Sequence, residues 1–522
     1  MGPAAPDAET PGDVAAEPIT RGECRSMRMP ERMGRRRFLK RFGALAGMLG
    51  AGRHVIGGAG RPRKCNILFI LIDDLGWRDV GFMGSRYYET PDLDRLAAQG
   101  MVFTRAYANA PNCAPTRACL MSGQYTPRHG IYTVGSSARG NSRYRKLIPV
   151  KNTTTLDANV VTLAEALKPA GYVCASMGKW HLGGADETKP TGQGFDVNVG
   201  GNAAGHPRSY FSPYRNRDLP DGPKGEYLTD RLTDEALKFI EANRDRPFFL
   251  YLPHYAVHTP IQAKAEMIAK YKAKKPDGGQ KNPAYAAMIE STDQGVGRII
   301  AKLDELKLAN NTVVVFFSDN GGHGQVTSMA PLRGSKGMLY EGGIREPMIV
   351  RWPGKVAAGS RCETAVIGVD FYPTFLEIAG APVPKGKVLD GESLVGLMTR
   401  GKPLKRKAIF WHFPCYLQAY GPGRWRTTPA GAVQQGDFKL LEFFEDGRLE
   451  LYNLKEDIGE SQDLAAKMPD KTQELHALLK AWRKRLGAPV PTQRNPDYDP
   501  SAPAGKPNKA GKKKARRKKS TP

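Results

Sequence analysis

The pattern of hydrophobic and polar positions predicts alternating helices and strands between residues 65 and 400. The stretch 66–72, NILFILI, is continuously apolar and ends in two acidic residues, which is typical of a strand buried on both faces of a parallel sheet. Further apolar runs at 247–253 and 312–317 each follow a helical pattern. Because this alternation extends over roughly 300 residues, it predicts an α/β fold with a large, mostly parallel central sheet flanked by helices.

The pattern changes after about Leu404. Three short alternating segments, AIFWHFP, GDFKLLEFF and GRLELYNL, are separated by turn residues and predict a small antiparallel sheet. An amphipathic helical pattern follows at 470–487. We therefore expect a smaller C-terminal domain of antiparallel sheet plus helix. The predicted division is a leader at 1–64, a catalytic domain at 65–400, a C-terminal subdomain at 401–490 and a basic, disordered tail at 491–522.

The net charge of +26 is concentrated at the two ends of the chain. Residues 1–64 carry +7 and residues 502–522 carry +9, which leaves +10 for the body. A mildly basic body suits an anionic substrate, and no specific nucleic acid is expected as a partner. The tail sequence GKKKARRKKSTP is interpreted as solvated and disordered, with a tether to an acidic polymer or surface as the alternative.

The leader contains an export pattern. The sequence RRRFLKRFG, followed by the weakly apolar run FGALAGMLGAG, resembles a twin-arginine signal. That run is too short and too rich in glycine to span a bilayer, so no transmembrane segment is predicted. The sequence thus predicts export by the bacterial twin-arginine machinery to the periplasm or the extracellular space.

Polar residues collect where the predicted strands end. In open α/β sheets, ligands bind beyond the carboxyl ends of the strands, so these residues could face one crevice. Three carboxylates and an amide offer hard oxygen ligands, which fit Ca²⁺ best and Mg²⁺ second. A cation and an imidazole near the same edge could hold an anion and move a proton. These residues are Asp73, Asp74, Lys179, His181, His258, Asp319 and Asn320.

The stretch CAPTRACLMSG, 113–123, places Cys113 in a distinctive setting. The residues alone leave several roles open: a thiol nucleophile, a metal ligand, half of a disulfide, a core residue or the precursor of another group. The seven cysteines show no paired spacing of a zinc site or a dense disulfide framework. Pairing of Cys113 with Cys119 is a further alternative.

Together these motifs resemble the sulfatase family of the alkaline phosphatase superfamily. CAPTRACLMSG matches the signature Cys-x-Pro-Ser/Thr-Arg with its following Leu-x-Ser/Thr-Gly, and GKWHLG at 178–183 matches the second signature. LIDDLGW, FFSDNGG, VHTP and SKGMLYEGGIREP occur in the family's order. Thr116 stands where the family more often has serine, and Val257 replaces a common proline.

The resemblance implies a formylglycine-dependent type I sulfatase. A maturation enzyme would oxidise Cys113 to Cα-formylglycine, whose hydrate is a gem-diol: one hydroxyl attacks sulfur and the other later expels sulfate. The implied metal ligands are Asp73, Asp74, modified Cys113, Asp319 and Asn320. The implied catalytic residues are Cys113, Arg117, Lys179, His181, His258 and Lys336, with His181 as the base in sulfate elimination and His258 as the proton donor to the departing alcohol.

Sulfated carbohydrate is the expected substrate. The alternatives are a phosphoester or phosphonate monoester hydrolase of the same superfamily and a non-catalytic sulfoglycan-binding protein. His206, Trp411 and His412 are further candidates for the wall of a substrate pocket.

Overall fold

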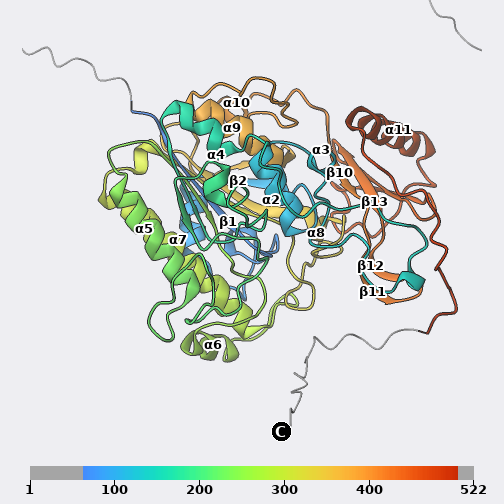
Figure 1. The fold of residues 1–522 in the computed structure, drawn as a ribbon, viewed down its shortest axis with the longest axis horizontal. Helices are drawn as coiled ribbons and strands as arrows, with labels where there is room; N and C mark the ends of the chain where they lie inside the picture. The colour runs from blue at the N-terminus through green and yellow to red at the C-terminus, as the bar shows by residue number, and fades with distance from the viewer. Residues whose placement is uncertain (1–62, 504–522) are drawn as a thin grey trace, which may run out of the picture. The chain divides into compact units, whose positions relative to one another are not determined.

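A computed structural model of the 522-residue chain describes residues 63–503. Within them, a nine-stranded mixed sheet has the order β4-β3-β5-β1-β6-β7-β2-β8, with β9 also paired to β2 (Figure 1). The pairs from β4 through β6 are parallel, whereas β7 is antiparallel to both β6 and β2. The strands are β1 (Asn66–Ile72), β2 (Met101–Tyr107), β3 (Val173–Met177), β4 (Val197–Val199), β5 (Phe248–Pro253), β6 (Thr312–Ser318), β7 (Arg345–Arg351), β8 (Ser360–Cys362) and β9 (Val366–Ile367).

Helices cover both faces of this sheet. Successive residues of β1 point to opposite faces, so Leu68 and Ile70 join one core and Phe69 and Leu71 the other. The first core includes residues of α1 (Pro91–Ala98), α5 (Leu228–Ala242), α6 (Ala265–Lys272) and α7 (Pro283–Glu305). The second includes residues of α2 (Cys113–Ser122), α4 (Leu163–Leu167), α9 (Phe371–Ala379) and α10 (Val395–Arg400), and Figure 1 shows these two groups on opposite sides of the strands. Two short helices, α3 (Thr126–His129) and α8 (Glu341–Ile344), complete this part.

The C-terminal residues form a four-stranded antiparallel sheet in the order β10-β13-β14-β15, beside α11. A two-stranded ribbon, β11 with β12, lies next to it. The predicted fold class is therefore confirmed, while the proposed boundary at residue 400 stays a prediction. The elements are β10 (Ala408–Phe413), β11 (Leu417–Gly421), β12 (Arg424–Thr427), β13 (Ala430–Gln435), β14 (Phe438–Phe443), β15 (Leu449–Asn453) and α11 (Pro469–Leu486).

The start of the predicted disordered tail is ordered in the structure up to residue 503. The side-chain amide of Asn495 donates to the carbonyls of Ser142 and Arg145, at 2.7 and 2.8 Å. The backbone nitrogen of Ile148 donates to Gln493 at 2.9 Å. These bonds hold 491–503 against the loop at 141–148, so this part departs from the prediction. Residues 504–522 and the twin-arginine pattern lie outside the described residues.

None of the helices between residues 63 and 503 is both long enough and apolar enough to cross a membrane.

Candidate active site

The ends of three neighbouring parallel strands place the predicted acids together. Because β5, β1 and β6 are adjacent, the residues that follow them meet at one edge of the sheet. The backbone nitrogen of Asp319, after β6, donates to Ile72 at 3.0 Å, and that of Asp74, after β1, donates to the Asp319 carboxylate at 3.3 Å. Asp73, Asp74, Asp319 and Asn320 are all fully or almost fully buried.

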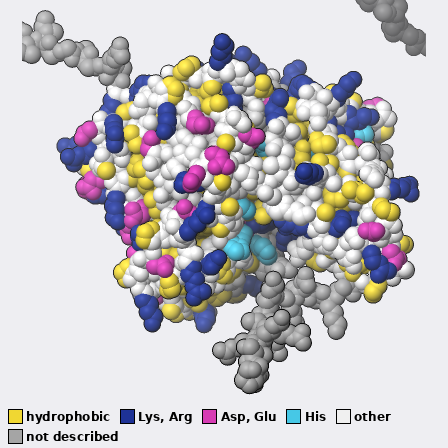
Figure 2. Space-filling model, in the orientation of Figure 1, with side chains coloured by type: hydrophobic (Ala, Val, Ile, Leu, Met, Phe, Trp, Pro, Cys, Tyr) yellow, Lys and Arg dark blue, Asp and Glu magenta, His cyan; other side chains and the backbone are white. Residues whose placement is uncertain are grey.

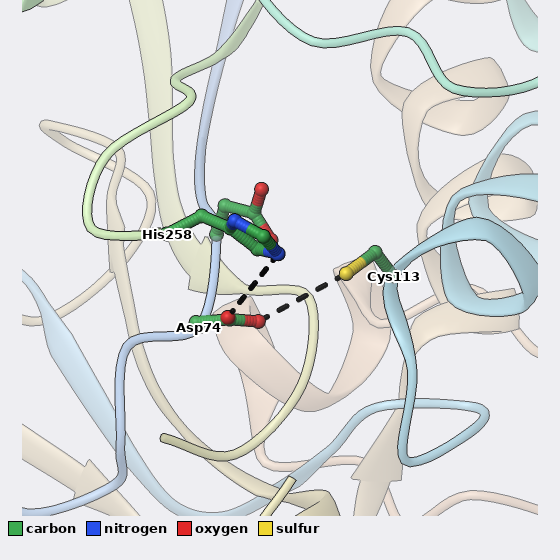
Figure 3. A group of neighbouring side chains, drawn as sticks. Asp74, Cys113 and His258 are labelled. Carbon is green, nitrogen blue, oxygen red and sulfur yellow. Dashed lines mark hydrogen bonds and ion pairs between the residues drawn. The ribbon is translucent and has the colours of Figure 1, made fainter. Parts of the chain in front are cut away.

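Helix α2 brings Cys113 to this edge from its own first turn. Every residue of the helix is buried, and its C-terminus is capped by Gly123 in the left-handed conformation. The Cys113 sulfur lies 3.9 Å from Asp74 Oδ1 and 3.4 Å from Lys336 Nζ. In Figure 3 the side chains of Asp74, Cys113 and His258 point toward a common centre.

Lys179 lies at the same site because the chain after β3 passes close to the end of β5. A Cβ on Gly178 would lie 2.0 Å from the carbonyl oxygen of Pro253, and Gly178 has φ +125°, so only glycine fits here. The next residue, Lys179, donates its backbone N–H to Pro253 at 2.7 Å. Its buried ammonium lies 2.5 Å from Asp73 Oδ2.

Arg117 connects the helix to two of these elements. Its Nε donates to Asp319 Oδ2 at 2.8 Å, and its Nη1 donates to the carbonyl oxygen of Lys179 at 2.7 Å. Both Arg117 and Asp319 are fully buried, so this ion pair is screened little by water. Arg117 therefore fixes the positions of α2, β6 and the loop after β3 relative to one another.

Lys336 closes the site from the glycine-rich loop before α8. Its backbone nitrogen donates to Gly322 at 3.0 Å, and its ammonium donates to the two carboxylate oxygens of Asp74 at 2.5 and 2.7 Å. Burial alone would raise the pKa of Asp74, but Lys336, with help from His258 and Lys179, outweighs it and holds that pKa far below its usual range. Asp74 is thus an ionised carboxylate.

Both predicted histidines lie at the site. His258 Nε2 is 3.6 Å from Asp74 Oδ2, and Nδ1 lies 2.8 Å from the carbonyl of Thr259, which identifies Nδ1 as the protonated nitrogen. Burial lowers the pKa of His258 to about 3. Burial and the neighbouring Lys179 also lower the pKa of His181. His181 has φ +64° and Asp74 φ +63°, in the left-handed region that non-glycine residues adopt uncommonly.

The residues at this edge fit a divalent cation. Single ligand atoms of Asp73, Asp74, Cys113 and His258 lie within 4.8 Å of one another. Among the described atoms, Asp73 Oδ1 and Asn320 Oδ1 are buried with no hydrogen-bond partner, which an oxygen-preferring cation would satisfy. Burial, and then the Asp73 charge, raises the pKa of Asp319, as expected for crowded acids.

The thiol of Cys113 is unsuited to act as a nucleophile itself. Burial, and then the Asp73 charge, raises its pKa to about 12, so the thiol stays protonated at neutral pH. Cys113 and Cys119 are both free, and therefore form no disulfide with each other. Cys119 instead lies 3.4 Å from His129 Nε2, in the core beneath the helix.

Among the other predicted pocket residues, only His206 lies at the site. Its ring centroid is 6.1 Å from that of His258. Trp411 and His412 are buried, and each is bonded to a backbone carbonyl, of Ala108 and Pro489 respectively. Sequence reasoning missed Arg139, a half-buried residue close enough to Cys113 to interact with it electrostatically. Arg139 belongs to a loop without periodicity, so no sequence signal places it there.

Comparison with known proteins gives consistent results over most of the chain. The model of the family described as sulfatase matches residues 65–381, and that of the N-sulphoglucosamine sulphohydrolase C-terminal region matches residues 335–486. A sulfatase of Formosa agariphila is 35% identical over 505 residues, which cover 82% of this chain and 90% of that protein. The N-acetylgalactosamine-6-sulfatase of Canis lupus familiaris is 34% identical over 400 residues, covering 71% and 73%. The solved structure of Ps i-CgsB in complex with k-i-k-neocarrahexaose has a TM-score of 0.69 at 28% identity, covering 85% and 95%.

Proposed function

The chain belongs to the sulfatase family and is a sulfuric ester hydrolase, and from this premise we propose that it hydrolyses sulfate esters carried by carbohydrates. The observation that carries the proposal is the buried cluster in which Cys113 lies against Asp74 and Lys336. The names of two relatives support a saccharide substrate, since one acts on N-acetylgalactosamine 6-sulfate and the other binds k-i-k-neocarrahexaose. The mildly basic body of the chain also favours a polyanionic substrate.

We propose that a maturation enzyme converts Cys113 to Cα-formylglycine. The hydrated aldehyde supplies a nucleophilic hydroxyl and a second hydroxyl through which sulfate can be released. The high pKa of the unmodified thiol supports a nucleophile other than the thiol itself, because a protonated thiol is a poor nucleophile.

We propose Ca²⁺ as the resident ion, with Mg²⁺ as the second choice. Asp73, Asp74, Asp319 and Asn320 would hold it together with an oxygen of the modified Cys113. When bound, the ion polarises a sulfate oxygen and favours the ionised form of the attacking hydroxyl. The two unpartnered buried oxygens, on Asp73 and Asn320, support this assignment.

The basic residues of the site orient and stabilise the sulfate group. In the proposed reaction, Lys179 and Lys336 donate hydrogen bonds to sulfate oxygens, where negative charge develops in the transition state. Arg117 offsets negative charge at modified Cys113 and keeps the loop of Lys179 in place. His181 accepts the proton when sulfate is eliminated, and His258 in its doubly protonated, imidazolium form donates one to the departing alcohol.

One experiment tests the modification and the reaction together. The full chain is produced in a host that has the maturation enzyme, and the mass of the peptide containing Cys113 is measured. We expect the mass of an aldehyde in place of the thiol, hydrolysis of 4-nitrophenyl sulfate faster than 4-nitrophenyl phosphate, and loss of activity on chelation that Ca²⁺ restores. An intact thiol in active protein would refute the formylglycine route, and faster phosphate hydrolysis would refute sulfate as the preferred ester.

We also propose that the protein is exported to the periplasm or the extracellular space by the twin-arginine route. The support is the sequence RRRFLKRFG in the leader. Replacement of Arg35 and Arg36 by lysine should retain the protein in the cytoplasm, which fractionation would measure.

A further inference from the structure

A pocket of about 470 Å³ lies beside the candidate active site. His206 lines it and also faces His258, with ring centroids 6.1 Å apart. The preceding Gly205 is in tight contact with His181, since a Cβ on Gly205 would lie 2.5 Å from the His181 ring. On the face drawn in Figure 2, histidine side chains gather in one group with lysine and arginine side chains next to it. The pocket therefore adjoins both histidines of the proposed mechanism.

The lining of this pocket is strongly basic. It includes Arg208, Arg215 and Arg217 but no aspartate or glutamate. Arg217 is already engaged, because its guanidinium pairs with Asp218 and donates to the carbonyl oxygen of Gly184.

Two of these arginines are free to bind a ligand. Arg208 and Arg215 are exposed, and neither guanidinium has a hydrogen bond or ion pair with any other residue in the described chain. Arg215 has φ +55°, and its backbone nitrogen donates to Asp221 at 3.2 Å, so the loop fixes its position. A free guanidinium matches the geometry of a carboxylate or a sulfate group.

The remaining walls suit a sugar ring. Tyr214 and Tyr255 form the buried floor of the pocket, since each is only 1% exposed, and their hydroxyls are bonded to Glu226 and Gly200, both at 2.8 Å. The lining also contains the small, exposed residues Ala203 and Ala204, whose short side chains leave room for a ring.

We propose that this pocket holds the part of the substrate that departs as the alcohol, and that this part is a saccharide bearing a second anionic group, bound by Arg208 and Arg215. The inference rests on the proposed function, which places the leaving alcohol next to His258. The second anion is a uronate carboxylate or another sulfate, which share the same bidentate hydrogen-bonding chemistry.

The test compares two matched pairs of substrates. One pair is a disaccharide of a uronic acid with a 6-O-sulfated N-acetylhexosamine and its carboxyl-reduced form. The other is a disulfated and a monosulfated N-acetylhexosamine. For each pair, the KM of the substrate with the second anion is divided by the KM of the substrate without it. In at least one pair, this ratio should be about tenfold or more higher in the variant R208Q/R215Q than in the wild type. The pair that responds identifies the second anion.

Arg361→Gln is the matched control. Arg361 is an exposed arginine on β8, at the edge of the central sheet opposite to β4 and the pocket. It should leave both KM ratios unchanged. Unchanged ratios in R208Q/R215Q for both pairs would overturn the subsite.

A failure of the proposed function would be recognised separately, because the mature wild-type protein would then release sulfate neither from 4-nitrophenyl sulfate nor from any of the saccharides. In that case, calorimetry on the full chain with the same two pairs measures the subsite directly. Tighter binding of an acidic member, abolished in R208Q/R215Q, would support the subsite, and equal binding would overturn it.

Discussion

Around Cys113, the ammonium groups of Lys179 and Lys336 each lie 2.5 Å from a carboxylate oxygen, of Asp73 and Asp74. With the pair of Arg117 and Asp319, three basic and three acidic side chains balance in charge. A divalent cation would add two positive charges and a sulfate monoester one negative charge. Because the two ligands carry opposite charges, binding of the ion should strengthen binding of the substrate, and the reverse.

Replacement of Lys336 by methionine should affect turnover more than substrate binding. The change removes the proposed donor to the sulfate group, so kcat should fall by roughly 10²–10³-fold. Steady-state kinetics with 4-nitrophenyl sulfate measures this. The exposed Lys355, changed to methionine in the same way, is the control and should retain wild-type kcat. A K336M variant with wild-type kcat would remove Lys336 from the mechanism.

Gly205→Ala should displace His181 without unfolding the chain. The new methyl group would lie 2.5 Å from His181 Cε1, so the imidazole must move. A displacement of this size should lower kcat by roughly 10–100-fold while the melting temperature changes little. Gly396→Ala, whose new methyl group would have its nearest neighbour at 3.5 Å, is the matched control. Equal kcat values for the two variants would contradict the role of His181.

At the scale of elements, Asp293 of α7 holds the start of α1. Its carboxylate accepts hydrogen bonds from the backbone nitrogens of Leu93 at 2.7 Å and Asp92 at 3.1 Å. Burial, and to a lesser degree Asp94, raises the pKa of Asp293 from 3.8 to about 7. The folded protein therefore binds this proton more tightly than the unfolded chain does.

The stabilisation from this proton is complete below the unfolded pKa of 3.8 and is lost as the pH rises through about 7. Asp293→Asn removes the titration. The wild type should lose stability between about pH 4 and pH 8, whereas the variant lacks this loss. The melting temperature of the variant minus that of the wild type should therefore rise by roughly a few degrees over this range. Thermal melts at several pH values measure this difference, and a difference independent of pH would refute the assignment.

The elements show what a sequence pattern can and cannot predict. The strand at 66–72 was predictable because both of its faces are buried, which makes it continuously apolar. The acids that follow it were predictable as site residues because ligands bind beyond the carboxyl ends of parallel strands. The antiparallel position of β7 was not, since strand order depends on contacts distant in sequence. The arginines at 208 and 215 gave no signal, because a loop has no periodicity and its position depends on tertiary packing.

At the scale of the whole molecule, the C-terminal sheet and the central sheet share a core. Residues of β2 and α2, Tyr107 and Cys119, pack in one cluster with Trp411 and Leu440 of the C-terminal sheet. Lys439 of β14 is fully buried, with its ammonium 2.9 Å from both Glu341 and Glu460. This ion network joins the C-terminal sheet to α8, which directly follows the loop of Lys336.

Lys439→Met should destabilise the whole molecule. It leaves two buried carboxylates without their shared cation, which costs roughly 3–5 kcal/mol. Lys471→Met, which breaks a partly exposed pair with Glu474, should cost only about 0–1 kcal/mol. Chemical denaturation of both variants measures the difference. Equal stability of the two would show that the buried network contributes little.

The complete burial of α2 limits when Cys113 can be modified. Cys113 is only 1% exposed, and the helix that carries it is covered along its whole length, so an enzyme that oxidises this thiol must reach it before the chain closes over it. Under the proposed conversion, maturation and folding compete for the same nascent chain. The fraction of active molecules in a preparation is then the fraction in which Cys113 was converted before the chain folded. This fraction cannot increase after folding.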